Sequence, residues 1–184
     1  MNKRLTGISK FLCFVLRHNP QALGITLDAE GWVEVDELLA AAARHGKLFT
    51  RLQLEEIVAT NDKKRFALSP DGRLIRANQG HSVEVDLGLM PVEPPELLYH
   101  GTVERFLASI REKGLLRGDR QHVHLSAERD TALRVGERRG RPVVLVVEAG
   151  RMHNEGHVFF RSENGVWLTE AVPSEYLRFP VDPV

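Results

Sequence analysis

A proline-bearing stretch separates two parts of this 184-residue chain whose hydrophobic patterns have different periods. Residues 81–97 contain Pro91, Pro94 and Pro95 beside acidic residues, which is typical of an extended connection. Apolar residues before it recur with the spacing of helices, whereas the runs after it favour strands. The sequence therefore predicts an α+β protein with one lobe at 1–80, a linker at 81–97 and a second lobe at 98–184.

The first part is predicted to contain three helices followed by a hairpin. The first helix carries an apolar stripe, could be capped by Thr6 or Ser9, and ends at Asn19-Pro20; the stripe is Ile8, Phe11, Leu12, Val15 and Leu16. A second helix, capped by Asp36, closes near Gly46, and a third opens at Thr50 with capping-box spacing. Residues 65–68 and 74–77 flank a Ser-Pro-Asp-Gly turn. This element order is that of a winged-helix unit.

The second part is predicted to contain strands and two helices. The helices are expected at 103–113, with Gly114 as the stop, and at 127–139. The near-continuous apolar run Pro142–Val147 predicts a strand inside a buried sheet. The other expected strands lie at 97–100, 122–126, 158–161 and 166–169.

The composition argues against a membrane protein and against a protein stabilised by disulfide bonds. No apolar run approaches the ~20 residues that a membrane-spanning helix needs, and the N-terminus lacks the apolar core of a signal peptide. Cys13 is the single cysteine, which fits a reducing compartment. We therefore expect a cytoplasmic protein without a membrane partner. Because the formal net charge is zero, binding of RNA would need a local basic patch.

Two basic motifs in the first part could bind phosphate. Arg17-His18 directly precedes the end of the first helix, where it could act as a phosphate clamp or simply as a cationic helix cap. Lys63-Lys64-Arg65 enters the hairpin, where one side chain could point into a cleft; a solvated charge run is the alternative.

Two motifs in the second part could bind a nucleotide or a metal ion. Tyr99-His100-Gly101-Thr102 lies between a strand and a helix, which suits a dinucleotide, although neither a Rossmann fingerprint nor a P-loop is present. In the Arg120–Ser126 motif, His122 and His124 share one face of a strand. They could form a metal site with His153 and His157, but the lack of an H-E-x-x-H motif and of paired cysteines argues against zinc.

Taken together, these segments resemble the KptA-type RNA 2′-phosphotransferases over nearly the whole chain. The matching stretches, in the family's order, are SKFLCFVLRHNP (9–20), GWVEVDEL (31–38), NDKKRFAL (61–68), RANQGH (76–81), YHGT (99–102), RQHVHLS (120–126) and NGVWLTEAVP (164–173). The resemblance implies a winged-helix N-terminal lobe and a C-terminal lobe of the ADP-ribosyltransferase type.

The resemblance also implies the site residues. The family's essential Arg-His-Arg-Arg set falls on Arg17, His18, Arg65 and Arg120. The NAD pocket would include His100, Gly101, Thr102, His124 and Ser126, with Gly114 and Leu115 as candidates on the adenosine side. Glu170 lies near the position of a glutamate that protein-modifying relatives use, but the resemblance implies that the RNA-directed family lacks that glutamate, and we assign Glu170 no role.

The implied reaction has two steps and needs NAD as a co-substrate but no metal. An internal RNA 2′-phosphate first displaces nicotinamide and gives ADP-ribosylated RNA. The adjacent ribose hydroxyl then attacks the phosphate, which releases RNA with a free 2′-OH and ADP-ribose 1″,2″-cyclic phosphate. The expected partner is a tRNA-like RNA with an internal 2′-phosphate, without an obligate protein partner. The alternatives are an ADP-ribosyltransferase that caps nucleic-acid phosphate ends and a non-catalytic NAD-sensing regulator that binds nucleic acid.

Overall fold

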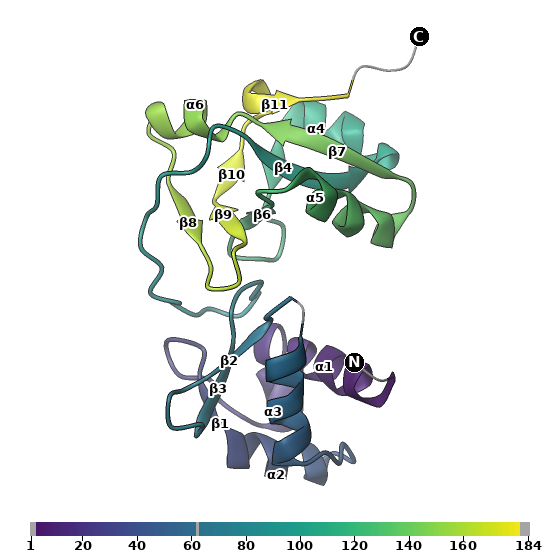
Figure 1. The fold of residues 1–184 in the computed structure, drawn as a ribbon, viewed down its shortest axis with the longest axis vertical. Coiled ribbons are helices and arrows are strands. Elements are labelled where there is room, and N and C mark those ends of the chain that lie inside the picture. The colour runs from purple at the N-terminus through teal and green to yellow at the C-terminus, as the bar shows by residue number, and fades with distance from the viewer. Residues whose placement is uncertain (1–2, 62, 181–184) are drawn as a thin grey trace. The chain divides into compact units, whose positions relative to one another are not determined.

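The computed structural model describes residues 3–61 and 63–180 and shows mixed helices and strands (Figure 1). The chain divides into two compact units, Met1–Gly88 and Leu89–Val184, which we call the first and the second unit. The division falls within residues 81–97, the stretch predicted as a connection. The α+β class predicted from the sequence is confirmed. In the described part of the chain, no helix combines the length and the apolar character needed to cross a bilayer.

The first unit contains a helix, a short strand, two helices and a hairpin, in that order (Figure 1). Its elements are α1 (Lys3–Arg17), the 3₁₀ turn η1 (Pro20–Leu23), β1 (Val33–Glu34), α2 (Val35–Arg44), α3 (Arg51–Thr60), β2 (Phe66–Leu68) and β3 (Leu74–Ala77). Strand β3 lies between β1 and β2 and is antiparallel to both. The predicted hairpin is confirmed, and β1 adds a third strand to it.

Helix α1 begins earlier than its predicted caps. The backbone is already helical at Lys3, so Thr6 and Ser9 lie inside the helix and the predicted start is wrong. Leu5 extends the buried stripe toward the N-terminus, which explains the extra turn. Ser9 is buried and accepts a hydrogen bond from Asn61 Nδ2 at 3.3 Å. The predicted end of α1 before Asn19-Pro20 is confirmed.

Of the other two predicted helix starts, that of α2 is wrong and that of α3 is confirmed. Helix α2 follows Glu34, and Asp36 lies in its first turn, where it pairs with Arg51 at 2.7 Å instead of capping the helix. At α3 the capping box is present in full, because Thr50 Oγ1 accepts from the Gln53 N–H and Gln53 Oε1 accepts from the Thr50 N–H. The helices and the sheet enclose one core, whose fully buried members include Leu12, Leu16, Ile25, Leu38, Leu54, Ile57 and Ile75.

The second unit is built from short strands with small helices on their faces (Figure 1). Its strands are β4 (Leu98–Val103), β5 (Leu115–Leu116), β6 (Val123–Leu125), β7 (Pro142–Val147), β8 (Phe159–Arg161), β9 (Trp167–Thr169), β10 (Ala171–Val172) and β11 (Leu177–Arg178). Its helices are α4 (Leu107–Lys113), α5 (Arg129–Gly136) and α6 (Ala149–Asn154), with 3₁₀ turns η2 (Glu104–Phe106), η3 (Glu137–Arg139) and η4 (Ser174–Tyr176).

Strand β7 occupies the middle of its sheet, as the apolar run predicts. It pairs with β4 on one side and β11 on the other, and both pairings are antiparallel. The predicted β8–β9 hairpin is confirmed, and β6 joins it on the other side of β9. A two-residue bridge between Tyr99 and Ser126 connects β4 to the chain after β6.

Several predicted boundaries in the second unit shift. The strand expected at 97–100 continues to Val103, and the helix expected at 103–113 therefore starts only at Leu107, after the turn η2. The helix expected at 127–139 shortens to α5, with η3 after it. Helix α6 was not predicted; Gly150 permits it to pack there, because a Cβ at that position would lie 3.1 Å from the Cα of Glu96.

Candidate functional site

Arg17 and His18 lie at the C-terminal end of α1, and the chain that follows β3 holds this end in place. The Arg17 carbonyl accepts hydrogen bonds from the backbone N–H groups of Ser82 at 2.8 Å and Val83 at 3.3 Å. The Ser82 hydroxyl lies 2.9 Å from His18 Nδ1. A segment 64 residues away in the sequence thus donates hydrogen bonds to a carbonyl of the last helical turn and orients the His18 ring.

His81 and Arg76 extend this cluster inward. His81 is 1% exposed, and the pKa of its imidazole is lowered from 6.5 to about 4 by burial, with Arg17, His18 and Arg76 as further causes. The Arg76 guanidinium stacks 4.5 Å from the centre of the Trp32 ring. His81 is therefore a neutral side chain beside cationic ones, of which Arg76 also pairs with Glu30 at 4.0 Å.

Arg65 is held by a hydrogen-bonded turn at the entrance to the hairpin. Its Nη1 donates to Asn61 Oδ1 at 3.2 Å, and Asn61 Nδ2 in turn donates to Ser9 on α1. The backbone of Asn78 donates to the Arg65 carbonyl at 2.9 Å. Lys64, the residue before Arg65, adopts a left-handed φ of 40°, which is unusual for a lysine and turns the chain into β2.

Arg120, His124 and His100 form a hydrogen-bonded chain in the second unit. Arg120 Nη1 donates to His124 Nδ1 at 2.8 Å, and His100 Nδ1 donates to the His124 carbonyl at 3.1 Å. Because a guanidinium only donates, His124 Nδ1 carries a lone pair; His100, by contrast, carries its proton on Nδ1. Burial lowers the pKa of His100, and the charges of Arg139 and Arg120 lower it further. Partial desolvation and the nearby Arg139 also lower the pKa of Arg120.

Gly101 and Thr102 lie on β4 beside His100. A Cβ on Gly101 would lie 1.8 Å from the Ala132 carbonyl oxygen, so the missing side chain allows α5 to pack against β4. Thr102 is buried, with 5% of its surface exposed. Ser126 exchanges two backbone hydrogen bonds of 2.9 Å with Tyr99, which places it at the edge of β4.

Gly114 and Leu115 have clear packing roles. Gly114 ends α4 with a φ of 72°, and a Cβ there would lie 2.2 Å from the Val172 carbonyl oxygen. The Leu115 side chain belongs to the core of the second unit and is 4% exposed. Any contact of Leu115 with a nucleotide would therefore be made through its backbone, and the adenosine-side role of both residues stays a prediction.

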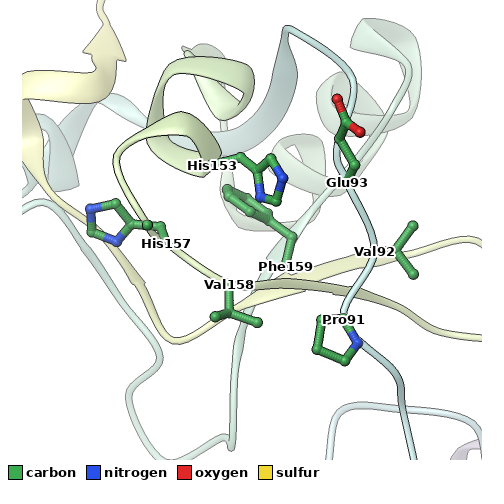
Figure 2. A pocket seen from close by; sticks show the side chains of 8 residues that line it. Pro91, Val92, Glu93, His153, His157, Val158 and Phe159 are labelled. Carbon is green, nitrogen blue, oxygen red and sulfur yellow. The ribbon is translucent and has the colours of Figure 1, made fainter.

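The four histidines considered for a metal site do not form one cluster. Across residues 3–61 and 63–180 there is no group of three or more His, Cys, Asp or Glu side chains arranged to hold a metal ion. His122 makes an edge-to-face contact with Phe160. His153 and His157 instead line a hollow of about 190 Å³, together with Glu93 and the apolar side chains Pro91, Val92, Val158 and Phe159 (Figure 2). None of the predicted site residues lines this hollow.

The structure thus places the predicted site residues in two groups. Arg17, His18 and Arg65 belong to the first unit, and Arg120 and the proposed NAD-pocket residues belong to the second. Three neighbours of these groups were not predicted from the sequence: His81, Asn61 and Arg139. His81 and Asn61 lie in the matching stretches RANQGH (76–81) and NDKKRFAL (61–68), but of the polar residues there the resemblance gives a role only to Arg65, because burial and hydrogen-bond partners arise only in the fold. Arginine and histidine are the main polar groups of both clusters, and this composition suits a protein that binds phosphate.

Comparison with known proteins assigns the chain to a family. The family described as "RNA 2′-phosphotransferase, Tpt1 / KptA family" matches residues 3–171. A probable RNA 2′-phosphotransferase of Streptomyces coelicolor is 58% identical over 97% of this chain and 97% of its own length. Proteins with the same description from Pseudomonas aeruginosa and Acaryochloris marina are 57% and 53% identical, each over 96% of this chain and 97% of its own length. The chain belongs to the RNA 2′-phosphotransferase, Tpt1 / KptA family.

Proposed function

We propose that this RNA 2′-phosphotransferase removes an internal RNA 2′-phosphate with NAD as co-substrate. In this proposal the first unit is a winged-helix lobe that binds the phosphate, and the second is an ADP-ribosyltransferase-like lobe that binds NAD. The observation that carries the proposal is the hydrogen-bonded chain from Arg120 through His124 to His100, in a sequence that matches the family from residue 3 to 171.

The side chains along β4 and β6 fit a dinucleotide. Because His100 donates Nδ1–H to the His124 carbonyl and burial lowers its pKa, its Nε2 is free to accept a hydrogen bond from a ribose hydroxyl. Ser126 offers a partly buried hydroxyl close by, and Arg120 offers a cation for a phosphate oxygen. When bound, NAD supplies a ribose carbon whose bond to nicotinamide breaks as the RNA 2′-phosphate bonds to it.

The arginines of both units suit the charge that this chemistry develops. A guanidinium stays charged and can hold two oxygens at once, so we assign Arg17, Arg65 and Arg120 as phosphate-binding residues. The hydrogen bonds from Asn61 to Ser9 and from Arg65 to Asn61 tie Arg65 to α1, which limits its freedom to move.

His18 is proposed to complete the second step. There the oxygen of the ribose 2″-hydroxyl bonds to phosphorus and the hydroxyl releases its proton, while the bond from phosphorus to the RNA 2′ oxygen breaks and that oxygen takes up a proton. His18 is exposed, and its Nδ1 is oriented by the Ser82 hydroxyl, so its Nε2 can deliver this proton. The products are then RNA with a 2′-OH, nicotinamide and ADP-ribose 1″,2″-cyclic phosphate.

The surface of α3 argues against a regulator that reads duplex grooves. Glu55 and Glu56 are both exposed on this helix, where like charge would repel a phosphate backbone. A catalytic role that engages RNA mainly through its 2′-phosphate agrees better with this acidic surface and with a net charge of zero. The physiological partner would be a tRNA-like RNA that carries such a phosphate.

The direct test is to incubate the purified chain with NAD and a short RNA that bears one internal 2′-phosphate, and to weigh both products. Loss of the phosphate together with ADP-ribose cyclic phosphate is expected. Intact RNA would contradict the proposal, and RNA heavier by ADP-ribose would indicate that only the first step occurs. The same RNA without the 2′-phosphate is the substrate control.

Single alanine variants test the residue roles. Arg65→Ala is expected to slow the second step and to leave ADP-ribosylated RNA detectable by mass. Turnover of Arg65→Ala at the parental rate, with no trapped RNA, would show that the assignment is wrong. Arg44→Ala removes an exposed arginine from the end of α2 and is the matched control.

A further inference from the structure

His81 is a buried polar side chain whose hydrogen-bonding capacity is unused. It is 1% exposed, and neither ring nitrogen has a hydrogen-bond partner among the residues that the structure describes. A neutral imidazole has one donor and one acceptor nitrogen, so both are left unsatisfied. Such groups are rare in folded proteins and often indicate a ligand or a functional role.

The surroundings of His81 show what could satisfy it. The charged groups that perturb it are Arg17, His18 and Arg76, all of which carry or can carry positive charge. A guanidinium has no acceptor, so neither arginine can take the N–H of His81. An anion attracted by these cations would bring the oxygen acceptor that is missing.

Backbone hydrogen bonds hold His81 next to the C-terminal end of α1, where the phosphate is proposed to bind. The next residue, Ser82, donates its N–H to the Arg17 carbonyl at 2.8 Å, and its hydroxyl meets His18 Nδ1 at 2.9 Å. On the other side His81 lies beside Gly31, where a Cβ would be 3.6 Å from His81 Nε2, an ordinary van der Waals distance. His81 therefore cannot move far without moving the Arg17-His18 pair.

We propose that His81 binds the RNA 2′-phosphate, as a neutral imidazole that donates its ring N–H to a phosphate oxygen beside Arg17 and His18. This inference rests on the proposed function, because it takes the RNA 2′-phosphate as the anion of this cluster. A neutral donor is suited to the position, since it adds a directed hydrogen bond without adding a further charge beside two arginines. Because the 2′-phosphate is the anion placed beside Arg17 and His18 in this proposal, His81 is expected to contribute only to the binding of RNA that carries it.

Binding measured without NAD tests this role, because no turnover can then occur. The probes are two RNAs of identical sequence, with and without one internal 2′-phosphate. His81→Phe fills the space without an N–H, and it is expected to weaken binding of the phosphorylated RNA by about ten- to a hundredfold. Binding of the unphosphorylated RNA is expected to stay as in the parent. His81→Gln, which retains an N–H donor, is expected to recover part of the loss.

His153→Phe is the matched control. His153 also has a buried Nδ1 without a hydrogen-bond partner among the described residues, but it lies in the second unit beside Phe159 (Figure 2). It is expected to bind both RNAs as the parent does. Parental affinity of His81→Phe for the phosphorylated RNA would overturn the inference, and so would an equal loss for both RNAs, which would indicate a structural role.

Failure of the proposed function gives a different result. If the parent itself binds both RNAs equally, the assignment of the phosphate site fails, whatever the His81 variants do. If His81→Phe does not fold, ring ¹⁵N spectra of the parent decide instead. A His81 ring N–H that shifts and exchanges more slowly on addition of the phosphorylated RNA, but not of the unphosphorylated one, is expected. An unchanged His81 signal would overturn the inference.

Discussion

Acidification should destabilise the first unit through His81. The pKa of this histidine is lowered from 6.5 to about 4 in the folded protein, chiefly by burial. Between these two values the unfolded chain binds a proton that the folded chain does not, so stability falls as the pH drops through this window. Above 6.5 the imidazole is neutral in both states and contributes no pH dependence.

The size of the effect follows from the two pKa values. With 6.5 in the unfolded chain and about 4 in the folded one, the loss in free energy of unfolding is about 2 kcal/mol at pH 5 and approaches about 3 kcal/mol near pH 4. A domain of this size has a total stability of roughly 5–15 kcal/mol, so the change is readily measurable.

The assay is urea unfolding of the parent and of His81→Gln at pH 7.5 and pH 5.0. Other groups also titrate over this range, so the informative quantity is the difference between the two proteins at each pH. Glutamine does not titrate, and its stability relative to the parent should therefore rise by about 2 kcal/mol on going to pH 5.0. Trp32, 4.5 Å below the Arg76 guanidinium, reports on the first unit if Trp167 is replaced by Phe in both proteins.

His45→Gln is the control, because it removes an exposed histidine from the end of α2 in the same unit. If the difference between the parent and His81→Gln were the same at both pH values, His81 would not be held neutral by burial. The lowered pKa of His81 in the folded protein would then be wrong.

Three further outcomes are expected. Gly101→Ala should destabilise the second unit by about 3 kcal/mol or more, because its Cβ would lie 1.8 Å from the Ala132 carbonyl oxygen. In the control Gly7→Ala no atom lies within 4 Å of the new Cβ, and helix propensity should stabilise the protein by up to about 1 kcal/mol. A melting temperature of Gly101→Ala at or above that of the parent would contradict the packing argument. Thr50→Ala should lower the free energy of unfolding by about 1 kcal/mol in urea titrations, whereas Thr50→Ser should keep the cap; parental stability of the alanine variant would show that the capping box contributes little. Turnover of 2′-phosphorylated RNA should continue in excess chelator, because arginines provide the charge that a metal would otherwise supply, and a loss of activity that magnesium or zinc restores would contradict this.

Local sequence signals predicted many of the elements. The capping box at Thr50, the stop before Pro20 and the turn at Ser69–Gly72 act within a few residues, so they determine the structure wherever the chain packs. The run Pro142–Val147 predicted a central strand because apolar side chains on both faces need cover on both sides.

Predictions failed where a distant contact competes with a local preference. Ser9 has the chemistry of a cap, but it turns inward to accept a hydrogen bond from Asn61, 52 residues away. Asp36 could cap α2, yet it pairs with Arg51. Helix α6 is only six residues long, too short to show a helical period in the sequence.

The candidate site shows the same contrast between local sequence signals and distant contacts. The sequence by itself determined which residue types are available: Arg17-His18 at a helix end, Arg65 at a strand entrance, and two histidines on one face of a strand. It could not show that Arg120 donates to His124, that His100 is partly buried with a lowered pKa, or that His81 is buried beside Arg17. Burial, the identity of a hydrogen-bond partner and the resulting proton affinity depend on which distant segments pack together, and only the tertiary structure decides that.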